Sequence, residues 1–454
     1  MSESPTTLGE ITKQVTKKVQ VSNLDLETYI STDNMLPNLG GIEKASGMPS
    51  IEKAKEFIVG DVLFSNIRTY FKKVWYAKFD GGCSNDVLVF RSNKSVNSRF
   101  LYYVLADNNF IDYTVQTAKG TKMPRGDKDA IIKYALNLPP LPEQKAIAHI
   151  LGKLDDKIEL NRQMNQTLET MAQALFKSWF VDFDPVLDNA LESGSEIPDS
   201  LQAMAEKRRV IANREERSGK PASPAGGQSH SKRLIKTNPA LAAQFPSAFV
   251  FNEVLDKWIP EGWGVKKLQE VVNVKYGKDH KKLGEGEIPC FGSGGVMRYV
   301  NEALFEFESV LIPRKGTLNN VMYLNKPFWS VDTMFYTETN QEKFVKYFFY
   351  VMNRLNFSEM NEGSAVPSMT TAQLNSMDIL LPSLESLTNF DSLVSKYFFK
   401  KDGNETQSES LTQLRDRLLP ELISGRVRVP SLEEQTGQEL GMVAEERGNY
   451  NLKS

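Results

Sequence analysis

Residues 102–104 read Tyr-Tyr-Val and residues 349–351 read Phe-Tyr-Val, and both stretches belong to a pattern that the chain carries twice. The offset between matching positions drifts only from 248, between Val62 and Val310, to 242, between Pro140 and Pro382. Two copies of so long a unit predict two similar domains in a pseudo-two-fold protein. The other matched stretches are Val62-Leu63-Phe64 with Val310-Leu311-Ile312, Ser84-Asn85-Asp86 with Ser330-Val331-Asp332, Gly120-Thr121-Lys122-Met123-Pro124 with Gly363-Ser364-Ala365-Val366-Pro367, and Pro140-Leu141-Pro142-Glu143 with Pro382-Ser383-Leu384-Glu385.

The composition is that of an ordinary globular protein long enough for several domains. Of 454 residues, 40% are hydrophobic and 25% are charged, and the net charge of -2 means that any basic surface must be local. The two cysteines, Cys83 and Cys290, lie one in each copy without Cys or His neighbours at metal-ligand spacing. Disulfides and structural zinc are therefore not expected, and a reducing cytoplasm is the predicted location. Residues 1–20 are polar and mixed, and no apolar run reaches about 18 residues, so neither a signal peptide nor a membrane span is expected.

The first copy, residues 1–143, reads as a mixed α/β domain. Short β-rich runs at Val62 to Phe64, Lys73 to Tyr76 and Val87 to Phe90 surround a helical patch from Arg99 to Ala106. The proline-rich stretch 138–143 then ends the domain. These prolines favour a helix start, and Glu143 suits the positive end of the helix that follows.

That helix carries a sustained heptad pattern, and an equivalent helix follows the second copy at an offset of 243, as between Asn161 and Asn404. Either each helix packs on its own domain or the two helices pair with each other, and the matched heptads favour an antiparallel coiled coil. Residues 145–180 as one helix would span roughly 54 Å. The first seam is Ile147, Leu154, Asn161, Leu168 and Leu175, matched by Phe390, Tyr397, Asn404, Leu411 and Leu418; the second is Ile150, Met164 and Met171, matched by Leu393, Gln407 and Leu414.

These signals divide the chain into six parts. We predict a first domain over 1–143, a spacer helix over 144–182 and a linker with a polar helical insert over 183–258. The second domain is expected over 259–381, the second spacer helix over 382–425 and a C-terminal tail over 426–454. The fold class is α/β (α+β), with two similar domains separated by two long helices.

The residues of a catalytic site are missing. The three histidines, His149, His230 and His280, have no triad or metal partner in the local sequence, and no Walker-type phosphate loop occurs. Phe291 to Gly295 is weakly similar to a methyltransferase glycine loop but is interpreted as a tight turn, since no Asn-Pro-Pro-aromatic motif accompanies it. No catalytic residue, metal site or cofactor is predicted for this chain.

Basic side chains instead cluster with polar and aromatic ones, in part after the matched Val62 and Val310 strands. Lys and Arg neutralise phosphates, while Arg, Asn and Thr read base edges, so these loops predict contact with double-stranded DNA. Solvated surface is the alternative for any single cluster. The candidates are Asn66, Arg68, Tyr70, Lys72, Lys73, Lys119, Thr121, Lys122 and Arg125 in the first copy, and Lys275, Lys278, His280, Lys281, Lys282, Arg314, Lys315, Thr317, Asn319 and Asn320 in the second.

The pattern of motifs resembles the specificity subunit of type I restriction-modification systems over nearly the whole chain. The most specific stretches are 138–148 (LPPLPEQKAIA), 150–158 (ILGKLDDKI) and 175–185 (LFKSWFVDFDP). Residues 259–263 (IPEGW) are similar to the usual opening of a second target-recognition domain. Residues 414–425 (LRDRLLPELISG) resemble the end of the distal helix. The stretch Leu384-Glu385-Ser386 departs from the usual proline-glutamate-glutamine pattern, which puts the docking surface there in doubt.

The resemblance implies a non-catalytic subunit whose two target-recognition domains each read one half of a bipartite, asymmetric DNA site. It implies that the spacer helices set the gap and dock two methyltransferase subunits carrying S-adenosylmethionine. That trimer would recruit restriction subunits that use ATP and Mg, giving an adenine methyltransferase and ATP-dependent endonuclease. The alternatives are a duplicated protein-interaction scaffold without DNA specificity and an enzyme with a dispersed active site.

Overall fold

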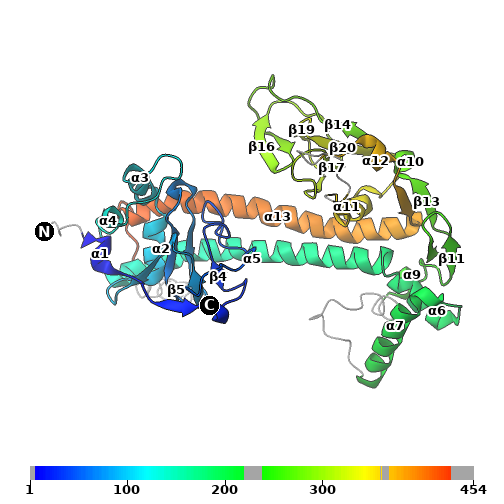
Figure 1. Cartoon of the computed structure of the whole chain (residues 1–454), viewed down its shortest axis with the longest axis horizontal. Helices are drawn as coiled ribbons and strands as arrows, with labels where there is room; N and C mark the ends of the chain where they lie inside the picture. The colour runs from blue at the N-terminus through cyan, green and yellow to red at the C-terminus, as the bar shows by residue number, and fades with distance from the viewer. Residues whose placement is uncertain (1–5, 219–237, 358, 360–367, 431–454) are drawn as a thin grey trace, which may run out of the picture. The chain divides into compact units, whose positions relative to one another are not determined.

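The computed structural model describes residues 6–218, 238–357, 359 and 368–430, and it separates into two compact units. Unit 1 comprises residues 1–162 and 404–454, and unit 2 comprises residues 163–403. The boundary falls inside two forty-residue helices, α5 (Leu141–Phe180) and α13 (Leu384–Ile423). Figure 1 shows these as the longest helices of the chain. They lie close to the predicted spacers, 144–182 and 382–425.

Unit 1 is a mixed α/β domain built around a four-stranded antiparallel sheet with the strand order β2-β9-β6-β7. A second sheet has the order β3-β5-β8-β4, in which only β4 and β8 run parallel, and β1 pairs with β10. The strands are β1 (Thr6–Thr7), β2 (Thr12–Gln14), β3 (Lys18–Gln20), β4 (Tyr29–Ile30), β5 (Lys53–Phe57), β6 (Val62–Ser65), β7 (Val74–Tyr76), β8 (Gly81–Cys83), β9 (Val87–Ser92) and β10 (Ala135–Leu136). The helices are α1 (Leu8–Ile11), η1 (Val21–Asn23), η2 (Thr69–Phe71), α2 (Ser98–Ala106), α3 (Asn108–Gln116) and α4 (Lys128–Ile131).

Unit 2 repeats this arrangement, which confirms the internal duplication. Its four-stranded antiparallel sheet has the order β14-β20-β17-β18, its β15 pairs in parallel with β19, and β13 pairs with β21. The strands are β11 (Phe249–Asn252), β12 (Lys257–Pro260), β13 (Gly264–Lys267), β14 (Val272–Tyr276), β15 (Ile288–Gly292), β16 (Gly295–Val300), β17 (Ser309–Pro313), β18 (Met322–Leu324), β19 (Trp329–Ser330), β20 (Met334–Thr339) and β21 (Asp378–Leu381). The helices are α6 (Asp184–Ser193), α7 (Asp199–Ser218), α9 (Pro239–Ala242), α10 (Leu268–Val271), α11 (Val345–Asn353) and α12 (Thr371–Asn375).

The duplication extends to local contacts. At the start of α1, Thr7 N donates to Glu10 Oε2 over 2.7 Å, and at the start of α10, Lys267 N donates to Glu270 Oε1 over 2.8 Å. A carboxylate that accepts from the residue before the helix satisfies an N–H that would otherwise lack a partner. The predicted matches that lie in residues 363–367 fall outside the described part of the chain.

Within each unit, α5 and α13 pack against each other and run antiparallel. In unit 1, Asp155 and Asn161 bond to Arg415 and Asn404 respectively, so the partner number falls as the α5 number rises. In unit 2, the same holds for Asn165 with Lys401 (3.3 Å) and for Phe176, whose ring centroid lies 6.1 Å from that of Phe390. Helix pairing is therefore confirmed over the alternative that each helix packs only on its own domain.

The first predicted seam is buried or half-buried at all ten positions, but the second seam is partly wrong. Met171 is 36% exposed and Leu414 is 45% exposed, and Gln407 is exposed as well. The neighbouring Ala172 and Arg415 are buried in their place. A straight helix drifts by about 20° per heptad relative to a strict seven-residue repeat, and both helices also pack against their domains, which moves the buried face.

Candidate nucleic-acid interface

In unit 1 the two predicted basic loops lie next to each other because backbone hydrogen bonds join them. Arg68 N donates to Pro124 O over 2.9 Å, and Gly126 N donates to Asn66 O over 3.1 Å. Lys119 and Arg125 exchange a second pair of bonds of 2.8 and 2.9 Å. The loop after β6 and the loop over 119–126 therefore form one surface, although about fifty residues of sequence separate them.

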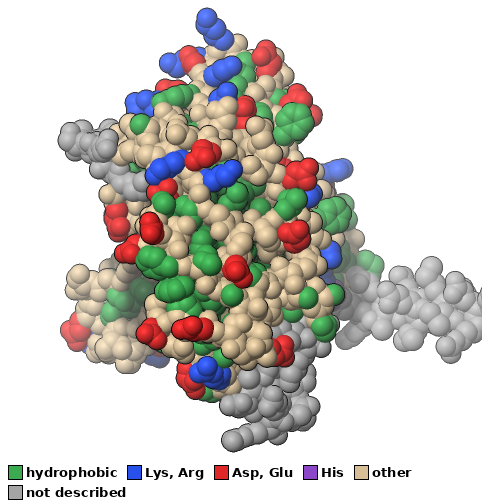
Figure 2. Space-filling model, turned by 90° about the vertical axis from the view of Figure 1, so that its right-hand side faces the viewer, with side chains coloured by type: hydrophobic (Ala, Val, Ile, Leu, Met, Phe, Trp, Pro, Cys, Tyr) green, Lys and Arg blue, Asp and Glu red, His purple; other side chains and the backbone are tan. Residues whose placement is uncertain are grey.

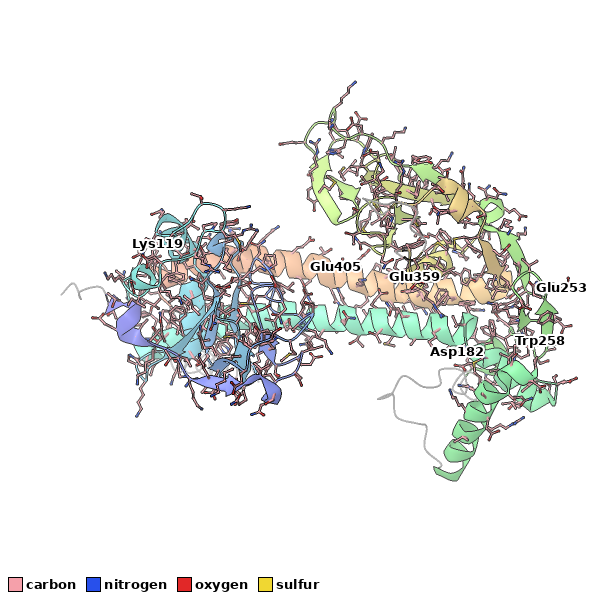
Figure 3. All side chains as sticks on the ribbon, in the orientation of Figure 1. Lys119, Asp182, Glu253, Trp258, Glu359 and Glu405 are labelled. Carbon is pink, nitrogen blue, oxygen red and sulfur yellow. The ribbon has the colours of Figure 1, made fainter. Side chains whose placement is uncertain are left out.

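The exposed side chains of this surface are those suited to contact a ligand. Arg68, Tyr70, Thr121 and Lys122 are exposed, as are the cations of Lys119 and Arg125. Arg68 and Lys72 have φ values of +49° and +50° on either side of η2, a conformation that is uncommon outside glycine. This constrained turn holds Tyr70 49% exposed. Figure 3 labels Lys119 at the edge of unit 1.

Other predicted residues of unit 1 are occupied by contacts within the domain. Lys72 Nζ donates to Asn108 Oδ1 over 2.8 Å, and Lys73 Nζ donates to Thr32 O over 2.6 Å. Burial lowers the pKa of Lys72. Asn66 is buried. These three positions support the loop, whereas Lys119 and Arg125 form exposed ion pairs, with Asp127 and Asp86, that a phosphate could replace.

In unit 2 the two predicted clusters meet beside residues 330–334. Lys278 N donates to Ser330 O and Arg314 N donates to Thr333 O, both over 2.8 Å. The Arg314 guanidinium also lies 5.3 Å from the ring centroid of Tyr276, the last residue of β14, and Nη1 donates to Asp332 O over 3.1 Å. One contiguous surface thus contains both clusters, as in unit 1.

The cationic and amide side chains of this surface differ in exposure and in their contacts with neighbouring elements. Lys278, Lys281, Lys282, Lys315 and Thr317 are exposed, and so is Asn319, although its Nδ2 donates to Asn356 Oδ1 over 3.3 Å. Asn320 is tied to the turn between β15 and β16, since its Nδ2 donates to Ser293 O over 2.9 Å. Lys275 lies 3.9 Å from the Glu338 carboxylate on the neighbouring strand, and the half-buried His280 accepts at its backbone oxygen from Leu283 N.

Sequence reasoning missed exposed apolar side chains in the same regions. Met123 is 51% exposed in the unit 1 loop, and Met297 and Tyr299 are 57% and 56% exposed on β16. The predicted stretch Phe291 to Gly295 contains the tight turn of the β15–β16 hairpin, and the Asn320 bond holds this hairpin beside the loop after β17. Apolar side chains contact the thymine methyl group in major-groove readout. In the sequence, residues 295–300 do not alternate strictly between apolar and polar side chains. This was the signal from which exposed apolar side chains could have been predicted here.

The described residues contain neither a metal-binding cluster nor a readily ionised thiol. Residues 6–218, 238–357, 359 and 368–430 contain no cluster of His, Cys, Asp or Glu that could hold a metal ion. Burial raises the pKa of the Cys83 thiol to about 12, and burial also raises the pKa of Cys290, so neither forms a thiolate readily. Among the helices that are described, none is long and apolar enough to cross a membrane.

Two similar α/β domains, each attached to a pair of long antiparallel helices and each carrying a basic loop surface, define a class of duplicated binding proteins. The family model described as the type I restriction modification DNA specificity domain matches residues 8–170 and 260–413, more than half of the chain. The chain therefore belongs to the type I restriction-modification specificity subunits, a family of non-catalytic subunits with a role in DNA specificity.

Two curated specificity subunits are similar to this chain over most of its length. The specificity subunit of the type I restriction enzyme HindI from Haemophilus influenzae is 26% identical over 92% of this chain and 98% of its own length. That of MjaIX from Methanocaldococcus jannaschii is 24% identical over 74% of this chain and 71% of its own. A crystal structure of a type I S subunit from M. genitalium covers 92% of this chain and 96% of its own at 16% identity, with a TM-score of 0.48.

Proposed function

We propose that this chain reads the two halves of a bipartite, asymmetric DNA site, one half with each unit, and sets the distance between them with its paired helices. The observation that carries this proposal is the duplicated surface: in each unit, loops distant in sequence join into one exposed group of cations and polar side chains. Major-groove reading needs such convergent donors, and phosphate neutralisation needs the lysines around them.

The proposal assigns catalysis to partner proteins. Two methyltransferase subunits dock on the helices and carry S-adenosylmethionine, and restriction subunits using ATP and Mg join the trimer. The directed activities are adenine methylation and ATP-dependent cleavage in the cytoplasm. The non-catalytic character of the family's specificity subunits supports a chain that positions other subunits rather than reacting itself.

One region of unit 2 fits a protein contact better than a DNA contact. In and beside the β11–β12 hairpin, Val250, Phe251 and Val254 are 40%, 49% and 63% exposed, and the Phe251 ring lies 5.6 Å from that of Trp258. Figure 3 labels Glu253 and Trp258 here, and Figure 2 shows hydrophobic side chains among acidic and basic ones on the unit 2 face that it presents. This favours a scaffolding contact alongside DNA reading rather than instead of it.

The isolated chain is expected neither to methylate nor to cleave DNA, because the specificity subunits of its family are non-catalytic. With a methyltransferase partner it is expected to direct methylation to a bipartite motif. The measurement is methylation mapping of genomic DNA from cells that contain the partner with or without this chain. A continuous motif, or no change of motif when the chain is omitted, would reject the proposal. Labelled methyl transfer by the purified chain alone would reject the division of labour.

The polar pair Asn161 and Asn404 is expected to set helix register without reading DNA. In unit 1 the buried Asn161 Nδ2 donates to Asn404 O, Gln407 Oε1 and Ser408 Oγ over 3.3, 3.0 and 3.2 Å. A polar seam residue specifies alignment at a cost in stability. Changing both asparagines to Leu should raise or preserve Tm, measured by thermal unfolding, and leave the methylated sequence unchanged. Loss of specific binding by a well-folded double variant would contradict this role.

A further inference from the structure

Each domain presents a cation and a tyrosine, four residues apart, to the long helices. Arg99 and Tyr103 lie on α2, and Lys346 and Tyr350 lie on α11. Both pairs match at the same offset, since 346 minus 99 and 350 minus 103 are each 247. Residues four apart lie on one face of a helix, so each domain uses the same face in the same way.

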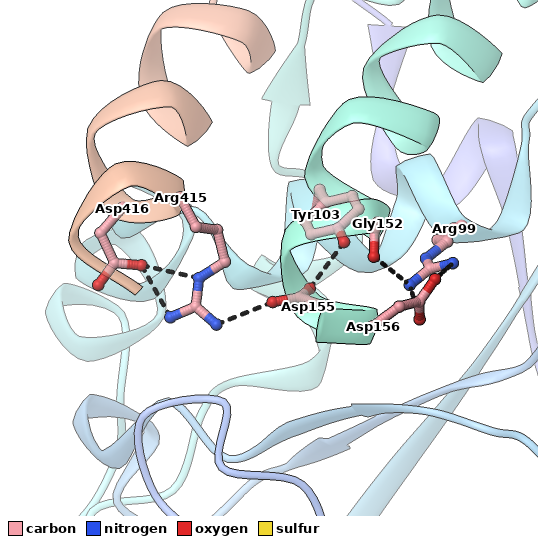
Figure 4. A network of polar contacts seen from close by, with 7 residues as sticks. All are labelled: Arg99, Tyr103, Gly152, Asp155, Asp156, Arg415 and Asp416. Atoms are coloured by element: carbon pink, nitrogen blue, oxygen red, sulfur yellow. Dashed lines mark hydrogen bonds and ion pairs between the residues drawn. The ribbon is translucent and has the colours of Figure 1, made fainter. Parts of the chain in front are cut away.

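In unit 1 these two side chains make directional contacts with α5, and one of the carboxylates they contact also bonds to α13 (Figure 4). Arg99 donates twice to the Asp156 carboxylate, over 2.6 and 3.0 Å, and once to Gly152 O over 3.0 Å. Tyr103 Oη donates to Asp155 Oδ2 over 2.7 Å. The other oxygen of Asp155 accepts from Arg415 Nη1 of α13 over 3.0 Å, and Arg415 is only 4% exposed. Asp155 thus joins α2, α5 and α13.

Gly152 supports this arrangement by leaving room for the guanidinium. A Cβ at this helical position would lie 2.7 Å from Arg99 Cζ and 2.8 Å from Arg99 Nε. Glycine inside a helix costs about 1 kcal/mol relative to alanine, and nothing in the helical geometry requires it at this position. The space that the Arg99 guanidinium needs explains the glycine at residue 152.

Unit 2 reaches the same result with different residues. Lys346 is 4% exposed, and its Nζ donates to Asp391 Oδ1 of α13 and to Glu308 Oε1, both over 2.8 Å. Tyr350 Oη lies 3.4 Å from Glu169 Oε1 of α5, and the other oxygen of Glu169 accepts from Lys401 Nζ of α13 over 3.1 Å. Again a carboxylate of α5 joins a domain tyrosine to a cation of α13.

We propose that Arg99 with Tyr103, and Lys346 with Tyr350, are positioning residues that hold each DNA-reading domain in one orientation on the helices and thereby make the half-site spacing strict. Apolar packing attracts without fixing direction, whereas a bidentate guanidinium–carboxylate pair and a charge-assisted hydrogen bond fix both distance and angle. The inference rests on the proposed function, because it concerns how exactly the two halves of one site are spaced.

The test compares methylation by the complex with its methyltransferase partner on duplexes whose spacer has the native length, one base pair more or one less. Tyr103→Phe removes one hydroxyl and Gly152→Ala displaces Arg99. Tyr103→Phe is expected to reduce the preference for the native spacer by about tenfold, as for the loss of one charge-assisted bond, and Gly152→Ala by at least about tenfold, while the bases read stay the same. Tyr102→Phe is the matched control, since the Tyr102 hydroxyl donates no hydrogen bond within the described residues.

Gly152→Ala distinguishes a loss of domain positioning from a loss of helix stability. Alanine favours the helix, so a purely structural loss predicts no relaxation of spacing in this variant. Strict spacing in both variants, or altered base choice with strict spacing, would overturn the inference. If the wild-type complex itself methylates no bipartite site, the proposed function fails instead, and the two outcomes are distinguished by the wild-type arm.

Discussion

Seven residues inserted into each long helix should lengthen the unread gap of the methylated motif and leave its two read halves unchanged. One heptad adds about 10 Å at 1.5 Å per residue and preserves the seam. That length corresponds to up to about three base pairs, given about 34–36 Å for 10–10.5 base pairs. Methylation of the original site should be almost completely lost, because the second domain would no longer meet its half-site.

The structure indicates where the insertions belong. Placing them between Arg162 and Gln163 in α5, and between Gly403 and Asn404 in α13, keeps the contacts of each unit intact. Asn161 then retains Asn404 in unit 1, and Asn165 retains Lys401 in unit 2. An insertion in α5 alone is the control, since it mismatches the two helices and should lose activity on every spacer length. An active double-insertion variant that methylates the original motif would rule out the helices as the spacer.

The fold was largely predictable because its signals are periodic or repeated. The heptad at Ile147 to Leu175 and the matching positions 243 residues later predicted the paired helices. The matched stretches that begin at Val62 and Val310 appear as the equivalent strands β6 and β17. The second seam was predicted partly wrong. Leu414 is exposed and Arg415 is buried, where it bonds to the carboxylate of Asp155, and no local pattern reports a partner 260 residues away.

The candidate surface was predictable as residue types but not as an arrangement. Nothing in the sequence pairs Arg68 with Pro124 or Arg314 with Tyr276, because those contacts come from the tertiary fold. The same holds for the lysines that are engaged internally. Lys72 and Lys73 are of a residue type that commonly contacts DNA, yet their ammonium groups donate to Asn108 and Thr32.

Alanine at Arg68 and alanine at Arg314 should each relax recognition at one position, in different halves of the motif. A guanidinium can donate two parallel hydrogen bonds to guanine, and losing such a pair costs about 1–3 kcal/mol, or roughly 5- to 150-fold in discrimination. Arg68 is exposed and forms no hydrogen bond or ion pair through its guanidinium among the described residues. Arg314 uses one N–H for Asp332 O, so others of its five donors remain for a base.

The lysines of unit 2 should behave differently from the two arginines. Lys278, Lys281 and Lys282 are close together in sequence and exposed, which suits a phosphate backbone rather than one base. Alanine at any of them should weaken binding to all sequences alike and reduce the slope of log K against log salt by about 1. Binding isotherms over a range of salt concentrations therefore separate the two kinds of contact.

The decisive experiment measures each variant, assembled with its methyltransferase partner, on duplexes altered in one half-site at a time. Arg162→Ala and Arg209→Ala are the matched controls, since each arginine is exposed and pairs with a glutamate on its own helix, Glu159 and Glu206. Both controls should retain wild-type discrimination. Arg68→Ala should relax only the half read by unit 1 and Arg314→Ala only the other, because the domain frameworks repeat while these loops do not. If both alanine variants relaxed the same half-site, the assignment of one domain to one half would fail.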